Sequence, residues 1–360
     1  MVRRVMTLVA ALVLLAGLGY GSSFLPMPYL VAAPGVTLDT LADQEDGQPI
    51  IGVEGADDYE HDGSISMVTV QYAGGPDQRI DLLSLVAAWL SPDQAVLPEE
   101  LLFPAGRSAE EVSERQTIQM NDSQTDATAA ALNQLNLAYD ATPLVADTLD
   151  DMPADGVVEP GDLITELDGE PVPTSTSEDD PEELVGSAYV VDRVAARDLG
   201  DQVELVLDRD GEEVEVELDT VRGENDAAAV GVLIADDMDF PVDIDIAVGE
   251  IGGPSAGMMF ALGIVDRLSE EGITGGVSVA GSGTVTSDGQ VGGVSGIPQK
   301  MVSAERDGAE YFFVAAESCD QVSQSAARDD LEVVSIETLT DAVDALDTIR
   351  EDGDDLPRCE

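Results

Sequence analysis

The residues of this sequence best suited to bond chemistry are a serine, Ser255, and a lysine further along the chain, Lys300. Ser255 lies in the segment GPSAG at 253–257, where the proline predicts the start of an amphipathic helix. The dipole and the unpaired backbone N–H groups at a helix N-terminus stabilise a developing oxyanion. Ser255 is therefore a candidate nucleophile, and its neighbours Gly253 and Ala256 are candidate supporting residues.

Lys300 is the only lysine in a chain that has fourteen arginines. It follows a glycine-rich run with a tight turn at Asp288-Gly289, and Pro298 predicts that it lies on the first turn of a helix. An arginine stays protonated, whereas a desolvated lysine near the positive end of a helix dipole is neutral closer to pH 7. A neutral amine accepts a proton from a serine hydroxyl, as in Ser-Lys catalysis. The alternatives are a solvated amine kept by chance and a serine that only caps a buried helix.

The histidine and cysteine content argues against other catalytic chemistries. The string around Ser255 also matches the nucleophile turn of α/β-hydrolases, but those enzymes need a histidine after the serine. The only histidine, His61, precedes Ser255, and its polar surroundings predict an exposed loop residue. With one histidine and two cysteines the sequence offers no cluster of metal ligands, so we expect no metal and no cofactor.

The charge of the chain restricts its partners. There are 74 acidic and 15 basic residues, and the formal net charge is -59. Such a charge repels nucleic acid, so DNA or RNA binding is disfavoured. Acidic residues spread along the whole chain are compatible with a protein kept soluble at high ionic strength, where salt screens the self-repulsion.

The N-terminus resembles a membrane segment. Arg3 and Arg4 precede the almost wholly apolar stretch 5–25, which at 1.5 Å per residue is long enough to cross a bilayer. We expect a short cytoplasmic tip (1–4), a single-pass anchor in the cell membrane (5–25) and the rest of the chain outside the cytoplasm. The alternative is a cleaved signal peptide. The next region, 26–136, has strand and helix patterns and no recognisable chemistry, and it is predicted to be a supporting β/α region.

The region 137–222 has the turns and strands of a small β-rich domain. A Pro-Gly-Asp turn at 160–162 leads into a short strand that ends at Asp168-Gly169, and a hairpin follows over 203–218. This arrangement resembles a PDZ domain. PDZ domains bind extended peptides, often by their free C-termini, so the resemblance implies polypeptide ligands. We expect the carboxylate-binding loop near Thr142–Val145. The alternative is a β-rich spacer without a ligand.

The region 230–350 has an α/β pattern and resembles the proteolytic domain of the Lon proteases. The motif at Ser255 and the segment that ends at Lys300 match the two catalytic motifs of that family, and Ser282 stands where the family has a supporting hydroxyl. Two departures are visible: Gly252 stands where many Lon enzymes have an aspartate, and this sequence contains no ATP-binding G-x-x-x-x-G-K-[ST] segment. The whole chain resembles the bacterial YlbL-like proteins.

Cys319 and Cys359 are the only cysteines, and Cys359 lies in the predicted C-terminal tail, 351–360. Outside the cytoplasm they are expected to form one disulfide; in the cytosol they would be two free thiols. The sequence thus predicts a multi-domain mixed α/β (α+β) chain that is an ATP-independent serine endopeptidase for unfolded polypeptides. The alternatives are an inactive, membrane-tethered PDZ scaffold and a protein that cleaves only itself. Homo-oligomer formation is left open.

Overall fold

The computed structural model describes residues 2–22, 27–44, 47–76, 78–104, 106–176, 184–223, 226–249, 251–351, 353 and 355–359. The chain forms two compact units. Unit 1 consists of Met1–Gln134 and Ile244–Glu360, and unit 2 is Leu135–Asp243. Both combine helices and strands, so the mixed α/β, multi-domain class is confirmed.

The centre of unit 1 is a six-stranded sheet with the order β18-β17-β14-β3-β1-β4. Strands β3, β14, β17 and β18 run parallel to one another, while β1 and β4 are antiparallel to their neighbours. Along the chain these strands are β1 (Tyr29–Asp39), β3 (Ser64–Gly74), β4 (Ala95–Pro98), β14 (Ser278–Ser282), β17 (Tyr311–Ala315) and β18 (Glu332–Ile336).

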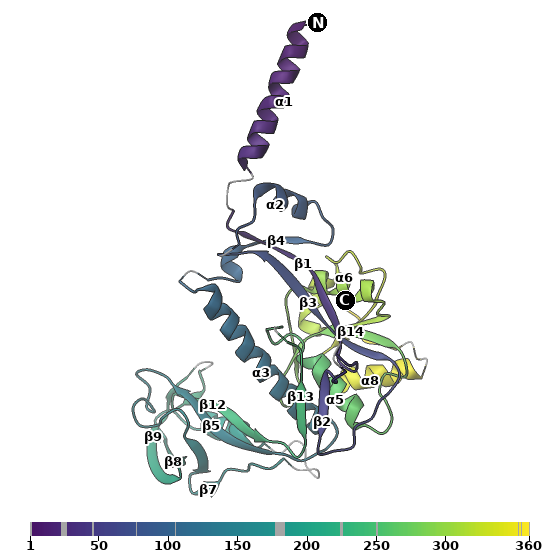
Figure 1. Cartoon of the computed structure of the whole chain (residues 1–360). Helices are drawn as coiled ribbons and strands as arrows, with labels where there is room; N and C mark the ends of the chain where they lie inside the picture. Colours follow the sequence, from purple (N-terminus) through teal and green to yellow (C-terminus); the bar gives the residue numbers. More distant parts are fainter. Residues whose placement is uncertain are drawn as a thin grey trace. The chain divides into compact units, whose positions relative to one another are not determined.

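This sheet corrects the predicted division of the chain. The supporting region 26–136 and the proteolytic region 230–350 were expected to be separate domains. Instead, β3 from the first region pairs with β14 from the second, and both regions belong to unit 1 (Figure 1). Local sequence patterns predicted β3 but carry no information on pairing partners far away in the sequence, so the division was wrong.

Two helices on opposite faces of the sheet position the predicted site. Successive residues of a strand point to opposite faces. Ala280 of β14 packs in one core cluster with Ile297 and Met301 of α6 (Ile297–Asp307), whereas a Cβ on the next residue, Gly281, would lie 2.6 Å from Met259 of α5 (Gly257–Leu268). Helix α5 is buried on every side over 257–267, so the prediction of an amphipathic helix from Ser255 was wrong in both its start and its exposure.

The remaining helices of unit 1 are α1 (Val2–Ser22), α2 (Leu82–Trp89), α3 (Ala109–Gln134), α7 (Cys319–Val322) and α8 (Leu339–Arg350), with short 3-10 turns at Glu99–Leu101 and Ala316–Ser318. Helices α3 and α8 pack against α5. Short strand pairs are formed by β2 (Ile51–Glu54) with β13 (Asp243–Ile246), and by β15 (Thr284–Val285) with β16 (Val291–Gly292).

The expected transmembrane helix is not found. Within the part of the chain that the structure describes, no helix is long and apolar enough to cross a membrane. Most of the expected anchor lies in helix α1, which begins at Val2 and ends at Ser22. Residues 23–25 of the expected anchor lie outside the described residues.

Unit 2 is built on a sheet with the order β12-β5-β6-β8-β9. Its elements are β5 (Asp140–Thr148), β6 (Leu163–Leu167), β7 (Glu170–Pro171), α4 (Gly186–Ala195), β8 (Gln202–Arg209), β9 (Glu212–Asp219), β10 (Val221–Arg222), β11 (Ala228–Ala229) and β12 (Val232–Asp239). The predicted hairpin is β8-β9, and its corner residues Asp210 and Gly211 have φ of 54° and 85°. Strand β12 pairs with β5, so unit 2 extends past residue 222 and includes a strand expected in the proteolytic region.

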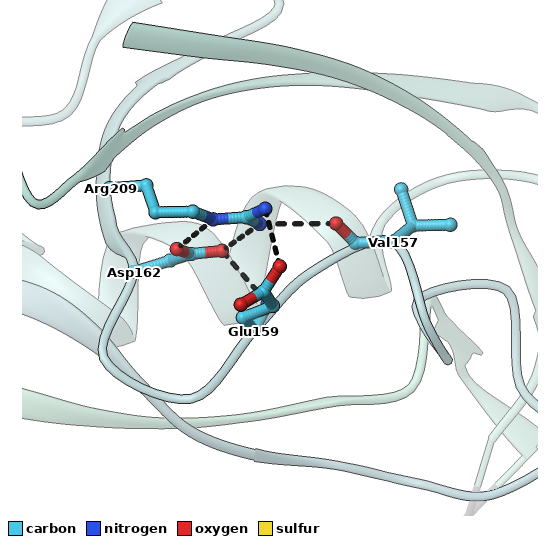
Figure 2. Close-up of polar contacts among 4 residues, drawn as sticks. All are labelled: Val157, Glu159, Asp162 and Arg209. Carbon is cyan, nitrogen blue, oxygen red and sulfur yellow. Dashed lines mark hydrogen bonds and ion pairs between the residues drawn. The ribbon is translucent and has the colours of Figure 1, made fainter. Parts of the chain in front are cut away.

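The Pro-Gly-Asp turn of unit 2 is fixed by an arginine. Arg209, at the end of β8, donates from Nε and Nη2 to the two carboxylate oxygens of Asp162, each at 2.7 Å (Figure 2). The same guanidinium contacts Glu159 and the carbonyl oxygen of Val157. The hydrogen bonds from Arg209 lower the pKa of Asp162, which is almost completely buried. These contacts tie the start of β6 to the hairpin.

The C-terminal tail is attached covalently to unit 1. Cys319, at the start of α7, forms a disulfide with Cys359, and their Cα atoms are 5.2 Å apart. Both side chains lie against the core cluster that contains Met301 and Phe312. Helix α7 is short and ends at Val322.

Candidate active site

Ser255 lies in the turn that immediately precedes α5, and Ala256 is the N-cap residue of that helix. The turn needs glycine at position 253, where φ is +93°, a value that side chains disfavour. Within the described residues, the backbone N–H groups of Ser255 and Ala256 make no hydrogen bond. The serine hydroxyl and two N–H groups without a partner among the described residues therefore lie together at the N-terminus of α5.

The structure brings Ser255, Lys300 and Ser282 together. Lys300, on the first turn of α6, has its Nζ 2.8 Å from Ser255 Oγ and 2.8 Å from Ser282 Oγ. Ser282, the last residue of β14, is completely buried and donates from Oγ to the carbonyl oxygen of Ser255 at 2.9 Å. Gly283 N donates to the same carbonyl oxygen at 3.1 Å. The strand end, the helix start and the nucleophile turn are thus joined at one point.

This network assigns a direction to each proton. Because Ser282 uses its hydroxyl proton on the Ser255 carbonyl oxygen, its Oγ must accept from Lys300. A neutral amine has two N–H bonds and one lone pair, and donation to Ser282 leaves the lone pair free for Ser255. Ser255 Oγ lies at hydrogen-bond distance from that nitrogen. The geometry fits a base that removes the Ser255 proton.

The surroundings of Lys300 favour its neutral form. Its side chain is 4% exposed, and burial lowers its pKa from 10.5 to about 8. None of the carboxylates that the structure describes forms an ion pair with it, although the chain has 74 acidic residues. A nearby carboxylate would stabilise the ammonium form and raise the pKa.

Helix α3, in which the sequence showed no chemistry, holds the nucleophile turn. The carbonyl oxygen of Gln116 accepts from Gly253 N at 2.9 Å, and Ser123 Oγ donates to the carbonyl oxygen of Pro254 at 3.1 Å. A Cβ at Gly252 would lie 2.9 Å from the Cβ of Gln116. The aspartate that many Lon enzymes carry at this position therefore does not fit here unless α3 moves. Only the close approach of helix and turn reveals this role, and no sequence pattern signalled it.

A pocket of about 520 Å3 opens beside the dyad. Its walls come from β3 (Met67–Tyr72), from Gln116, Gln119 and Met120 of α3, and from the turn 251–256. Strand β14 pairs with β3 only over Ser64–Met67, so beyond Met67 the described part of β3 has a partner strand, β1, on one side only. The unpaired edge of β3 therefore faces the dyad.

His61, the other residue considered as a candidate from the sequence, does not contact the dyad. His61 is half-buried and not exposed as predicted, and its Nε2 is 3.0 Å from the carbonyl oxygen of Ser269. No group of three potential metal ligands occurs among the residues that the structure describes.

Loss of the Ser282 hydroxyl is expected to reduce turnover by about tenfold, less than loss of the dyad. In Ser282→Ala, Lys300 loses the acceptor that orients its lone pair, but a water molecule partly replaces it, which limits the cost. Steady-state kinetics on an unfolded protein measure the effect. Ser282→Thr keeps the hydroxyl and should retain more activity than Ser282→Ala; equal loss in both variants would contradict a role for the hydroxyl.

Comparisons with known proteins agree with parts of this description. Residues 211–347 match the family model of the Lon protease (S16) C-terminal proteolytic domain, which supports a serine peptidase activity. Solved structures similar to the chain include the PDZ domains of SdrC-like proteins from Listeria innocua and Listeria monocytogenes. Both are 22% identical with a TM-score of 0.22; the first covers 26% of this chain and 92% of its own, the second 27% and 90%. No curated protein matches the chain.

Proposed function

We propose that the chain is a serine endopeptidase that uses Ser255 as nucleophile and Lys300 as general base, without an ATP-driven motor. The observation that carries this proposal is the position of a buried amine, with its pKa lowered to about 8, at 2.8 Å from the Ser255 hydroxyl. An inactive scaffold would be favoured by a hydroxyl and an amine held apart, and here they are in contact.

The contacts support a two-step acyl transfer. Neutral Lys300 takes the proton of Ser255 as Oγ attacks the scissile carbonyl carbon, and the carbonyl oxygen becomes an oxyanion beside the free N–H groups of Ser255 and Ala256. The Lys300 ammonium then donates its proton to the leaving amine as the C–N bond breaks. A water molecule, deprotonated by Lys300, hydrolyses the resulting ester and restores the serine.

The pocket supports an extended substrate. A peptide segment that lies along the unpaired edge of β3 gains main-chain hydrogen bonds there and passes next to Ser255. A folded protein has few segments free to do this. Since this sequence has no ATP-binding loop, we propose that its substrates are unfolded chains or flexible segments.

Incubation of the soluble part of the chain, from about Ala33, with an unfolded protein would test this function. Because Ala33 lies within β1, a second preparation that begins at Met27 keeps that strand whole. Wild type should produce fragments without ATP, and Ser255→Ala should produce none. Cleavage at an undiminished rate by Ser255→Ala, or a requirement for added nucleotide, would contradict the proposal. Circular dichroism of both preparations confirms that they are folded.

A second function, peptide binding by unit 2, is favoured by an apolar pocket of about 550 Å3. The pocket lies between α4, which contributes Val190, Val191 and Val194, and the segment 227–234, which includes β11 and the start of β12. Strand β12 is the terminal strand of its sheet, so its outer edge is available for an added peptide strand.

The pocket is at odds with the expected carboxylate-binding loop at Thr142–Val145. That segment belongs to β5, which lies between β12 and β6 and pairs with both. Its main-chain groups are therefore engaged in the sheet. We propose instead that the peptide terminus lies near 227–231, where the chain leads into β12 at the pocket.

Fluorescent peptides that end in an apolar residue test this second function. The free-acid peptide should bind the full chain more tightly than its amide, and Val191→Glu should weaken binding, because Val191 lines the pocket and is 56% exposed. Leu199→Glu is a matched control, since Leu199 is 49% exposed and lies outside the pocket. Equal affinity for acid and amide would contradict recognition of the C-terminus.

We also propose that the protein acts outside the cytoplasm, attached to the cell membrane. The disulfide supports an oxidising compartment, and α1 exposes a run of apolar side chains that includes Val5, Leu8 and Leu12. Protease added to intact cells should remove unit 1, and the chain should sediment with membranes; protection of unit 1 from the protease would contradict an external location.

The native protein is expected to contain the Cys319–Cys359 disulfide. Mass spectrometry without reduction should find one linked peptide pair. The bridge closes a loop with a sequence separation of 40, for which loop entropy gives about 4 kcal/mol of stabilisation. Recovery of both cysteines alkylated without prior reduction would contradict the bridge and weaken the argument for the compartment.

A further inference from the structure

The pocket beside Ser255 continues into a second pocket of about 570 Å3. The two pockets share Tyr72, Leu102 and Ser295 as lining residues, so they form one groove, which we call the substrate groove. The second pocket adds walls from β4 and its flanks, from the start of α6 and from the α7 region.

The substrate groove differs in charge from the rest of the chain. Among the described residues, none that lines either pocket is Asp or Glu, although 74 of the 360 residues are acidic. Lys300 is the only charged side chain that lines it in the part of the chain that the structure describes. The polar lining is instead rich in glutamine: Gln71, Gln116 and Gln119 in the first pocket, and Gln94, Gln299, Gln321 and Gln324 in the second.

The need to keep Lys300 neutral explains why no described carboxylate lines the first pocket, but it does not explain the same feature of the second pocket. A carboxylate close to Lys300 would raise its pKa and keep it protonated. Lys300 does not line the second pocket, so its basicity does not account for the lack of acidic residues there. The lack of acidic residues in the second pocket therefore needs another explanation. The most direct explanation is the kind of substrate side chain that this pocket receives.

Charge decides which side chains this pocket accepts. Acidic walls would attract Lys or Arg and repel Asp or Glu, at about 1 kcal/mol for two charges 4 Å apart in water. A glutamine amide donates to a carboxylate and accepts from a neutral donor without a net charge. The chain has a net charge of -59, but pocket walls without acidic side chains do not repel an acidic ligand at short range.

We infer that the second pocket of the substrate groove is a specificity subsite that receives acidic or neutral side chains of the substrate and does not select basic ones. This inference rests on the proposed peptidase function. Its chemistry identifies the substrates as polypeptides with acidic or uncharged segments next to the cleaved bond.

Three sets of quenched fluorescent peptides test the subsite. They are identical except that Glu, Gln or Lys is placed at each position in turn on either side of the cleaved bond. In wild type, at least one position should show a kcat/KM at least fivefold higher for Glu than for Lys. Gln94→Glu/Gln324→Glu should lower this Glu-to-Lys ratio about tenfold, and 1 M salt should reduce the change. Both replaced side chains are exposed, so folding should be retained.

The control is Gln78→Glu/Gln202→Glu, which adds the same two charges at exposed positions outside the substrate groove. It should leave the Glu-to-Lys ratio unchanged. A preference for Lys in wild type, or an equal change of the ratio in both variants, overturns the subsite. Absence of any cleavage that depends on Ser255 would instead reject the peptidase function, so the two failures are distinguishable.

Discussion

Lys300→Arg should abolish peptidase activity while the fold is retained, although arginine keeps the charge and the chain has fourteen arginines. The Lys300 amine must be neutral to take the Ser255 proton, and a guanidinium stays protonated at any working pH. General-base assistance contributes about 10² to 10⁴ in rate. Turnover of an unfolded protein measures the loss.

The dyad should behave as one unit in these measurements. Ser255→Ala and Lys300→Arg should be similarly inactive, and the double variant scarcely worse, because groups that act together lose nearly all their effect when either is removed. Lys300→Met, an uncharged side chain of similar length, separates loss of the base from burial of a charge. If Lys300→Arg kept turnover near that of wild type, Lys300 would not be the base, and the scaffold function would replace the peptidase.

The chemistry of the site could be predicted from sequence because its residues are rare in this chain. Because the chain has one lysine and one histidine, few residues could be assigned as the base. The glycine and proline residues around Ser255 and Lys300 specify turns and helix starts locally. The structure places Ser255 and Lys300 in contact; Ser282, expected only from the resemblance to the Lon family, lies against Lys300 as well. The groups that hold the nucleophile turn were not predictable, because the hydrogen bonds of Gly253 and Pro254 with α3 depend on tertiary packing.

The domain boundaries failed for the same reason. The pattern of β3 predicts a strand, but its parallel pairing with β14 joins segments about 200 residues apart, and no local signal encodes that partner. Likewise, the sequence pattern of β12 predicts a strand but does not indicate the unit to which it belongs. Only its pairing with β5 places it in unit 2. The expected carboxylate-binding loop at Thr142–Val145 rested on no specific sequence signal, and the structure places that segment in β5, between β12 and β6.

The pH dependence of catalysis should report the pKa of Lys300. Burial lowers that pKa to about 8, so the amine is mostly neutral above pH 8 and mostly protonated below it. The protonated amine has no lone pair for Ser255, so kcat/KM should rise with pH, tenfold per unit below pH 8, and level off above it. At pH 6 the rate should be about 100-fold below its maximum. A profile measured between pH 5.5 and 10 at constant ionic strength, with circular dichroism at each end, tests this.

His61→Gln is the control, because histidine is the side chain that ordinarily titrates between pH 5 and 8, and His61 contacts Ser269 and not the dyad. The variant should keep the same profile; a pH dependence that is lost in His61→Gln would contradict Lys300 as the base.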